Sequence, residues 1–87
     1  MTEKNKDRLF KFIIRCQRNH NKPDLHSFFI NIDNGKAYVE CRSTYEVYLE
    51  IRQYGDVIDK ITKWTGTAIA AANKLIQLNA DITTIDM

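Results

Sequence analysis

Apolar and polar residues alternate on both sides of the dipeptide Asn34-Gly35, over residues 26–42. Both residues of the dipeptide tolerate the positive φ angles of a type I′ turn, so the pattern predicts a tight β-hairpin in which Asp33 opposes Lys36. Because side chains alternate between the two faces of a strand, the expected core face carries His26, Phe28, Ile30, Ile32, Ala37, Val39 and Cys41. The other face carries Phe29, Asn31, Tyr38, Glu40 and Arg42.

Residues 9–18 fit two periodicities. As a strand, they would place four apolar side chains on one face: Phe10, Phe12, Ile14 and Cys16. As a helix, they would group Leu9, Ile13 and Cys16. Aromatic and β-branched residues are enriched in strands, so their abundance here favours a strand.

Signals for two helices follow the hairpin. Ser43 and Glu46 have the spacing of a capping box, which predicts a helix over residues 44–54 that ends at Gly55. A second helix is predicted from Thr67 to about Leu78 by its inward-facing Ile, Ala and Leu residues.

Two further segments are expected to be short strands. Residues 57–64 fit a strand or a helix on periodicity, and the glycines on either side favour a separate strand. Residues 80–87 alternate imperfectly, as an edge strand does.

These elements predict an α+β fold in which residues 1–87 form one domain with the order β-β-β-α-β-α-β. A mixed sheet would be covered on one face by the two helices. The alternative is three antiparallel strands followed only by helices, with residues 57–64 helical, which is close to a double-stranded-RNA-binding layout.

Positive charge is concentrated near the N-terminus. The formal net charge of the chain is +2, whereas residues 1–22 carry +5 and residues 23–87 carry −3. Such polarity concentrates positive potential on one element and suits a polyanionic partner. A solvated, frayed N-terminus is the other interpretation.

Composition excludes several classes of protein. With 44% hydrophobic and 28% charged residues, the chain is typical of a globular domain. It has no apolar run of the roughly 18 residues that a membrane span needs, and its charged N-terminus is unlike a secretory signal. We therefore expect a cytoplasmic protein without a membrane partner. Its bias toward Ile, Asn and Lys is typical of AT-rich coding sequences, such as those of a phage or an AT-rich bacterium.

No catalytic motif is present, so we expect neither an enzyme nor a bound cofactor. Cys16 and Cys41 match no metal-ligand spacing. In a three-stranded meander these two residues would lie about 10 Å apart, beyond the roughly 7 Å limit for a disulfide. His20 and His26 are expected in a loop or in the core.

The sequence Thr65-Gly66-Thr67 connects an expected strand to the second helix. Gly66 would let a ligand approach the backbone, and the unpaired N–H groups of the first helical turn favour an anion. The alternative is purely structural, with Thr65 capping the helix.

Four segments of residues 37–87 resemble the Alba-type nucleic-acid-binding superfamily, which includes ribonuclease P/MRP subunits: AYVECRS, TYEVYLEIRQYG, DKITKW and TGTAIAAANKLIQL. The last segment is similar to the family's Gly-x-Gly-x-Ala-Ile motif and Ala-rich helix, with Trp64 or Thr65 in place of the first glycine. Family members end with a long basic hairpin, whereas the basic segment here is N-terminal. The resemblance implies nucleic-acid binding and a homodimer.

We therefore expect a small RNA- or DNA-binding protein, with RNA preferred, that uses a basic N-terminal hairpin and the glycine turn. The candidate binding residues are Lys11, Arg15, Arg18, Lys22, Arg42, Lys60, Lys63, Trp64 and Gly66. Exposed aromatic residues such as Trp64, Tyr38 or Phe29 would stack on unpaired bases.

The alternative is a protein-interaction module: a regulatory or phage-encoded inhibitor of a host or defence protein such as a ribonuclease, acting alone or with RNA. It would use an open sheet edge or the Tyr-rich helix that carries Tyr45, Tyr48 and Tyr54.

Overall fold

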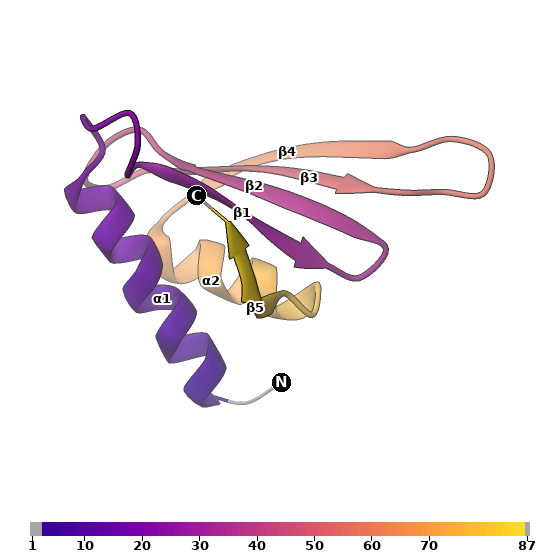
Figure 1. Cartoon of the computed structure of the whole chain (residues 1–87), viewed down its shortest axis with the longest axis horizontal. Coiled ribbons are helices and arrows are strands. Elements are labelled where there is room, and N and C mark those ends of the chain that lie inside the picture. The colour runs from indigo at the N-terminus through magenta and orange to yellow at the C-terminus, as the bar shows by residue number, and fades with distance from the viewer. Residues whose placement is uncertain (1–2, 87) are drawn as a thin grey trace.

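The computed structural model describes residues 3–86. Its elements are α1 (Glu3–Arg18), β1 (Ser27–Ile32), β2 (Gly35–Cys41), β3 (Val47–Gln53), β4 (Lys60–Gly66), α2 (Ala68–Gln77) and β5 (Asp81–Asp86). The five strands form one antiparallel sheet in the order β4-β3-β2-β1-β5. Both helices lie on the same face of this sheet (Figure 1). The predicted α+β class is confirmed, although the sheet is antiparallel rather than mixed.

Residues 9–18 belong to helix α1, so the expected N-terminal strand is wrong. Leu9, Ile13 and Cys16 recur at helical spacing and are completely or almost completely buried. Phe12 packs edge-on against Phe28 of β1, with ring centroids 4.9 Å apart. The aromatic content of this segment therefore serves helix-to-sheet packing and is not a sign of extended backbone.

Residues 47–53 form strand β3, so the helix expected over residues 44–54 is also wrong. Val47, Leu49 and Ile51 are buried on one face of the strand, while the side chains between them lie on the other. The Ser43 hydroxyl does accept a hydrogen bond from the backbone N–H of Glu46 at 3.0 Å, as a cap would. It closes a single turn, after which the alternating pattern extends the chain. The element order is therefore α-β-β-β-β-α-β.

The β1–β2 hairpin is present in a different register. Ile32 pairs with Gly35, and the two-residue loop is Asp33-Asn34, with Asn34 at a φ of 57°. A Cβ atom at Gly35 would lie 1.8 Å from the carbonyl oxygen of Arg52, so glycine is needed there for the close approach of β3. The pairing differs from the expected one by two residues, which leaves every side chain on its predicted face. The predicted core face is confirmed from Phe28 to Cys41, and His26 lies just before β1.

Strand β4, helix α2 and strand β5 match their predicted types, and the layout with residues 57–64 helical is excluded. The Thr67 side chain caps α2 by accepting from the backbone N–H of Ala70. At the other end, Asn79 has a φ of 56°, and the N–H groups of Asn79 and Ala80 bond to carbonyls of the last turn. Between these caps, α2 connects β4 at one edge of the sheet to β5 at the other edge.

Cys16 and Cys41 are free and buried, with their side chains close together. Cys16 lies on α1 and Cys41 on β2, so the three-stranded meander from which their separation was predicted is wrong. Their proximity follows from the helical conformation of α1, which packs over β2. A hydrogen bond between the two side chains lowers the pKa of Cys16 and raises the pKa of Cys41 above its usual range.

Substitution of Gly35 by Ala tests the close approach of β2 and β3. The new methyl group would overlap the Arg52 carbonyl oxygen, a backbone atom that can move only with its strand. We expect a loss of about 3 kcal/mol in the free energy of unfolding, measured by urea denaturation. Lys36→Ala is the matched control, because the Lys36 side chain is exposed; equal stability of the two variants would contradict the packing argument.

Candidate functional site

The exposed side of α1 carries a row of five cations, which we call the α1 stripe: Lys4, Arg8, Lys11, Arg15 and Arg18, all exposed. Their spacing alternates between four and three residues, which keeps them on one face of a helix. At 1.5 Å per residue the stripe is about 21 Å long. Among the α1 side chains that the structure describes, Asp7 is the only carboxylate, and it forms an ion pair with Lys11 at 3.0 Å.

A groove of about 550 Å³ runs beside the α1 stripe. Its lining combines cations and apolar side chains: Arg8, Phe10, Lys11, Phe12, Ile14, Arg15 and Arg18. The guanidinium carbon of Arg15 lies 4.6 Å from the centroid of the Phe12 ring, and this contact orients the side chain along the helix. The groove can therefore hold anionic groups while apolar surface flanks them.

The structure divides the predicted binding residues into separate groups. Lys11, Arg15 and Arg18 lie together on α1, and Lys22 follows in the loop after it. The predicted residues of β4 lie on the edge strand at the far side of the sheet from β5: Lys60, Lys63, Trp64 and Gly66. The structure thus places the candidate residues on two different elements, α1 with the loop after it and β4.

Gly66 is explained by its neighbour Trp64. A Cβ atom at Gly66 would lie 2.4 Å from the indole ring of Trp64. Trp64 is itself partly buried against the hydrophobic core. The helix cap is Thr67 and not Thr65. The turn is thus a packed strand-to-helix connection, and these contacts account for its glycine without a ligand.

The face of the sheet away from the helices is open, and we call it the open face. In an antiparallel sheet, directly paired residues lie on the same face. The pairing therefore aligns three rows across β4, β3, β2 and β1: Thr65-Tyr48-Glu40-Ser27, Lys63-Glu50-Tyr38-Phe29 and Ile61-Arg52-Lys36-Asn31. Sequence reasoning missed Arg52 because the capping-box pattern predicts a helix over residues 44–54. It missed Lys36 because the expected register places that residue beside the turn, opposite Asp33. The alternation of residues 47–53 is the signal that could have placed Arg52 on this face.

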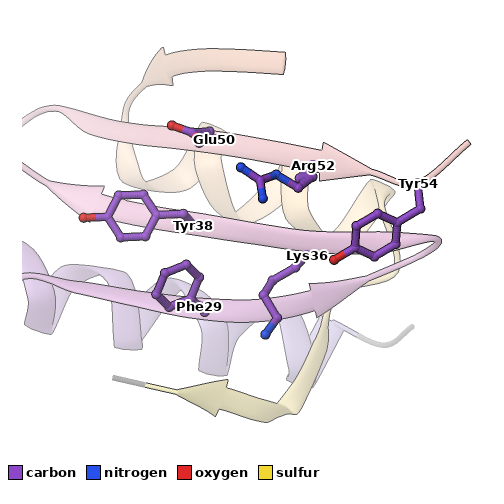
Figure 2. Close-up of a pocket in the computed structure, with 6 residues that line it drawn as sticks. All are labelled: Phe29, Lys36, Tyr38, Glu50, Arg52 and Tyr54. Atoms are coloured by element: carbon purple, nitrogen blue, oxygen red, sulfur yellow. The ribbon is translucent and has the colours of Figure 1, made fainter. Parts of the chain in front are cut away.

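The open face is hollowed near the turn between β1 and β2 (Figure 2). The hollow has a volume of about 120 Å³ and six lining residues: Phe29, Lys36, Tyr38, Glu50, Arg52 and Tyr54. The rings of Phe29 and Tyr38 lie side by side, with centroids 5.1 Å apart and planes tilted by 47°. The Lys36 ammonium lies 5.8 Å from the centroid of Phe29. We call this hollow the aromatic pocket.

Hydrogen bonds to glutamates hold the tyrosines of the open face. The Tyr38 hydroxyl donates to Glu40 at 3.0 Å, and the Tyr48 hydroxyl donates to Glu50 at 2.9 Å. Arg42, one of the predicted phosphate-binding residues, also donates to Glu40 and lies over the Tyr48 ring at 4.2 Å. Arg42 is thus already paired with a carboxylate, which makes it a support of this surface.

The environment of Glu40 favours its ionised form. Burial raises the pKa of Glu40, but the hydrogen bonds from Arg42 and Tyr38 oppose burial and the net pKa is lowered. His26 lies 3.6 Å away and adds attraction when it is protonated.

Two kinds of site are missing from the part of the chain that the structure describes. Within residues 3–86, no group of three or more Cys, His, Asp or Glu side chains is arranged to hold a metal ion. Neither of the two described helices has the length and apolar character needed to cross a bilayer.

Comparison of the chain with models of known protein families, with curated proteins and with solved structures gave no match in any of the three. The Alba-type resemblance therefore stays a prediction. Functional inference rests on the α1 stripe and the open face themselves.

Replacement of Glu40 by Gln tests the polar cluster through pH. A carboxyl whose pKa is lowered by folding stabilises the native state above its unfolded pKa, and that contribution is lost as pH falls through the folded value. We expect Glu40→Gln to be less stable than the wild type at pH 7, with the difference shrinking as pH falls below 4.5, the ordinary pKa of this side chain. Urea denaturation at a series of pH values measures it. A stability difference that does not change with pH would contradict the assigned role.

Proposed function

We propose that the protein binds nucleic acid and that the α1 stripe holds the phosphates. The main support for this proposal is the row of five exposed cations on one helix. Among the described side chains of α1, only one is a carboxylate. Phosphate neutralisation by Lys and Arg supplies most non-specific affinity for nucleic acids. The excess of positive charge, predicted on a hairpin, lies on a helix and is continuous along it.

The way α1 is buried indicates that the anionic partner of the α1 stripe is a nucleic acid rather than a lipid surface. A helix that binds a bilayer interface inserts an apolar face beside its cationic one. Most of the apolar surface of α1 packs inside the protein, since Leu9, Ile13 and Cys16 are buried in the core and Phe12 contacts Phe28 of β1. RNA remains our preferred nucleic acid, because aromatic side chains on the open face suit unpaired bases.

The proposal places the protein in the cytoplasm. Its two buried cysteines are free although they are adjacent, which agrees with a reducing compartment.

Substitution of Arg15 and Arg18 by Gln tests the α1 stripe. Removal of one phosphate-binding cation should lower the slope of log K against log salt by about one unit. We expect the double variant to flatten the slope by up to about two units for any RNA or DNA sequence. Fluorescence anisotropy of a labelled oligonucleotide between about 50 and 200 mM salt measures the slope.

Lys60→Gln with Lys63→Gln is the matched control, because it removes the same charge from β4 on the far edge of the sheet. If the two double variants change the salt slope equally, only the net charge matters, and the assignment of the α1 stripe as the binding site is wrong. Circular dichroism of each variant verifies that α1 stays folded, since Arg15→Gln also removes the contact with Phe12.

A second candidate function, protein pairing, is favoured by the β4 edge. Exposed apolar residues gather along this edge and the loop before it: Val57 is 97% exposed, Ile58 79% and Ile61 50%. An unpaired strand edge readily accepts another strand. We propose that a second copy of the chain occupies it and forms the homodimer.

The residues of β4 are self-complementary in one register. Antiparallel pairing about Ile61 would set Ile61 opposite its own copy and Ile58 opposite Trp64. The same register would set Lys63 opposite Asp59 in both halves, and opposite charges across a strand pair are stabilising. A register centred on Lys63 would instead oppose two lysines. Because the interface uses the same edge twice, it closes as a dimer.

Reversal of one charge tests this register. We expect the wild type to sediment with concentration-dependent mass up to twice 10.2 kDa. Asp59→Lys should remain monomeric at concentrations where the wild type pairs, because it sets two lysines against each other. The double reversal, Asp59→Lys with Lys63→Asp, should restore the dimer. A wild type that stays at 10.2 kDa at every concentration would contradict the homodimer and leave the edge to a different protein.

A further inference from the structure

We infer that the aromatic pocket of the open face is a site for one unpaired nucleotide of a single-stranded nucleic acid. The base would stack on Phe29 and Tyr38, and the adjacent phosphate would lie between Lys36 and Arg52. The inference deepens the proposed function, since it names unpaired strands as the ligand class. It rests on residues that the α1 stripe does not contain.

The aromatic side chains of the pocket form a platform that is both exposed and held in place. Phe29 is 44% exposed even though it contacts the Tyr38 ring, so one side of the pair remains available. Tyr38 is fixed through its hydroxyl by Glu40. Bases stack on aromatic side chains in any sequence context because every base has a π face, and such contacts govern recognition of single strands. A duplex keeps its bases stacked inside and cannot use this platform.

Two cations lie beside the platform. Lys36 of β2 pairs directly with Arg52 of β3, so both side chains rise from neighbouring strands on the same face. Figure 2 shows them on the side of Phe29 and Tyr38 that faces Tyr54. A phosphate there would be one step from a base on Phe29, because the Lys36 ammonium is 5.8 Å from the ring centroid.

The size and charge of the pocket further limit which ligands it can bind. Sites for drug-sized ligands occupy about 300–1,000 Å³, whereas this pocket measures about 120 Å³. It therefore suits one planar ring at the surface. Glu50 also lines the pocket, and its carboxylate weakens binding of a bare polyphosphate. The same carboxylate can accept a hydrogen bond from an amino or ring N–H group of a base.

A comparison of three ligands tests the inference: a single-stranded RNA oligonucleotide, an abasic strand with the same number of phosphates, and the RNA duplex. Anisotropy competition gives their relative affinities. We expect the wild type to bind the RNA strand roughly tenfold or more tightly than the abasic strand, as loss of base stacking implies. Phe29→Thr should reduce that preference to near one and should leave binding of the abasic strand unchanged.

Leu25→Thr is the matched control. Leu25 is 43% exposed in the loop before β1, so this change also removes exposed apolar surface of a similar extent. It should keep the preference for RNA over the abasic strand. Thermal unfolding of both variants verifies that each is folded. If Phe29→Thr does not fold, titration of the wild type with adenosine monophosphate replaces it, with ring resonances of Phe29 and Tyr38 expected to shift.

Several results would overturn the inference. These are equal binding of RNA and abasic strands by the wild type, equal effects of Phe29→Thr and Leu25→Thr on the preference between them, or an effect of Phe29→Thr on duplex binding as large as its effect on the single strand. Unshifted ring resonances in the nucleotide titration would do the same. The outcome is separate from that of the α1 stripe, because Arg15→Gln with Arg18→Gln should weaken RNA and abasic strands alike. If the wild type shows no preference for RNA over the abasic strand, but the Arg15/Arg18 variant flattens the salt slope, only the pocket is refuted. If the preference is present and the salt slope does not change in that variant, only the α1 stripe is refuted.

Discussion

Burial of the apolar side of α1 against the sheet is the contact on which the rest of the structure depends. Leu9 and Ile13 are completely buried and join the residues of β1, β2, β3 and α2 in one core. Full burial of a side chain of this size stabilises the fold by roughly 1.5–3 kcal/mol. Because this side of the helix is committed to the core, its five cations face solvent in a single row. Because α1 and α2 cover the same face of the sheet, the other face stays open.

The two surfaces that result differ in chemistry. The α1 stripe is almost purely cationic, so it suits the backbone of any nucleic acid. The open face alternates aromatic, cationic and acidic side chains in aligned rows, and its tyrosine hydroxyls are tied to glutamates. The rings there are held in place before a ligand arrives, which reduces the conformational entropy lost on binding. Strands also position side chains more rigidly than loops do, and every residue of the aromatic pocket except Tyr54 lies on a strand.

Much of the fold could be predicted, and the two errors share one cause. The hairpin faces, helix α2 and the last two strands followed from local signals, although the cap of α2 is Thr67 rather than the expected Thr65. Residues 9–18 and 44–54 carried signals for both helix and strand. In α1, the aromatic residues suggested a strand, but Phe12 is there because it packs on Phe28 of the sheet. At Ser43, a hydroxyl that closes one turn looked like a helix cap. These errors moved the cations from a helix to a hairpin and hid Arg52 of the open face.

The sequence by itself determined the alternating faces of β1 and β2, the approximate span of α2 and the concentration of positive charge near the N-terminus. Each depends on spacing between neighbours or on composition, which three-dimensional context does not alter. Only the tertiary structure decided that α1 is a helix, that β3 is a strand and that Trp64 fills the space beside Gly66. It also decided which side chains from different strands share the aromatic pocket. Contacts between distant residues select among the conformations that a short segment permits, and that selection is made only when the whole core is assembled.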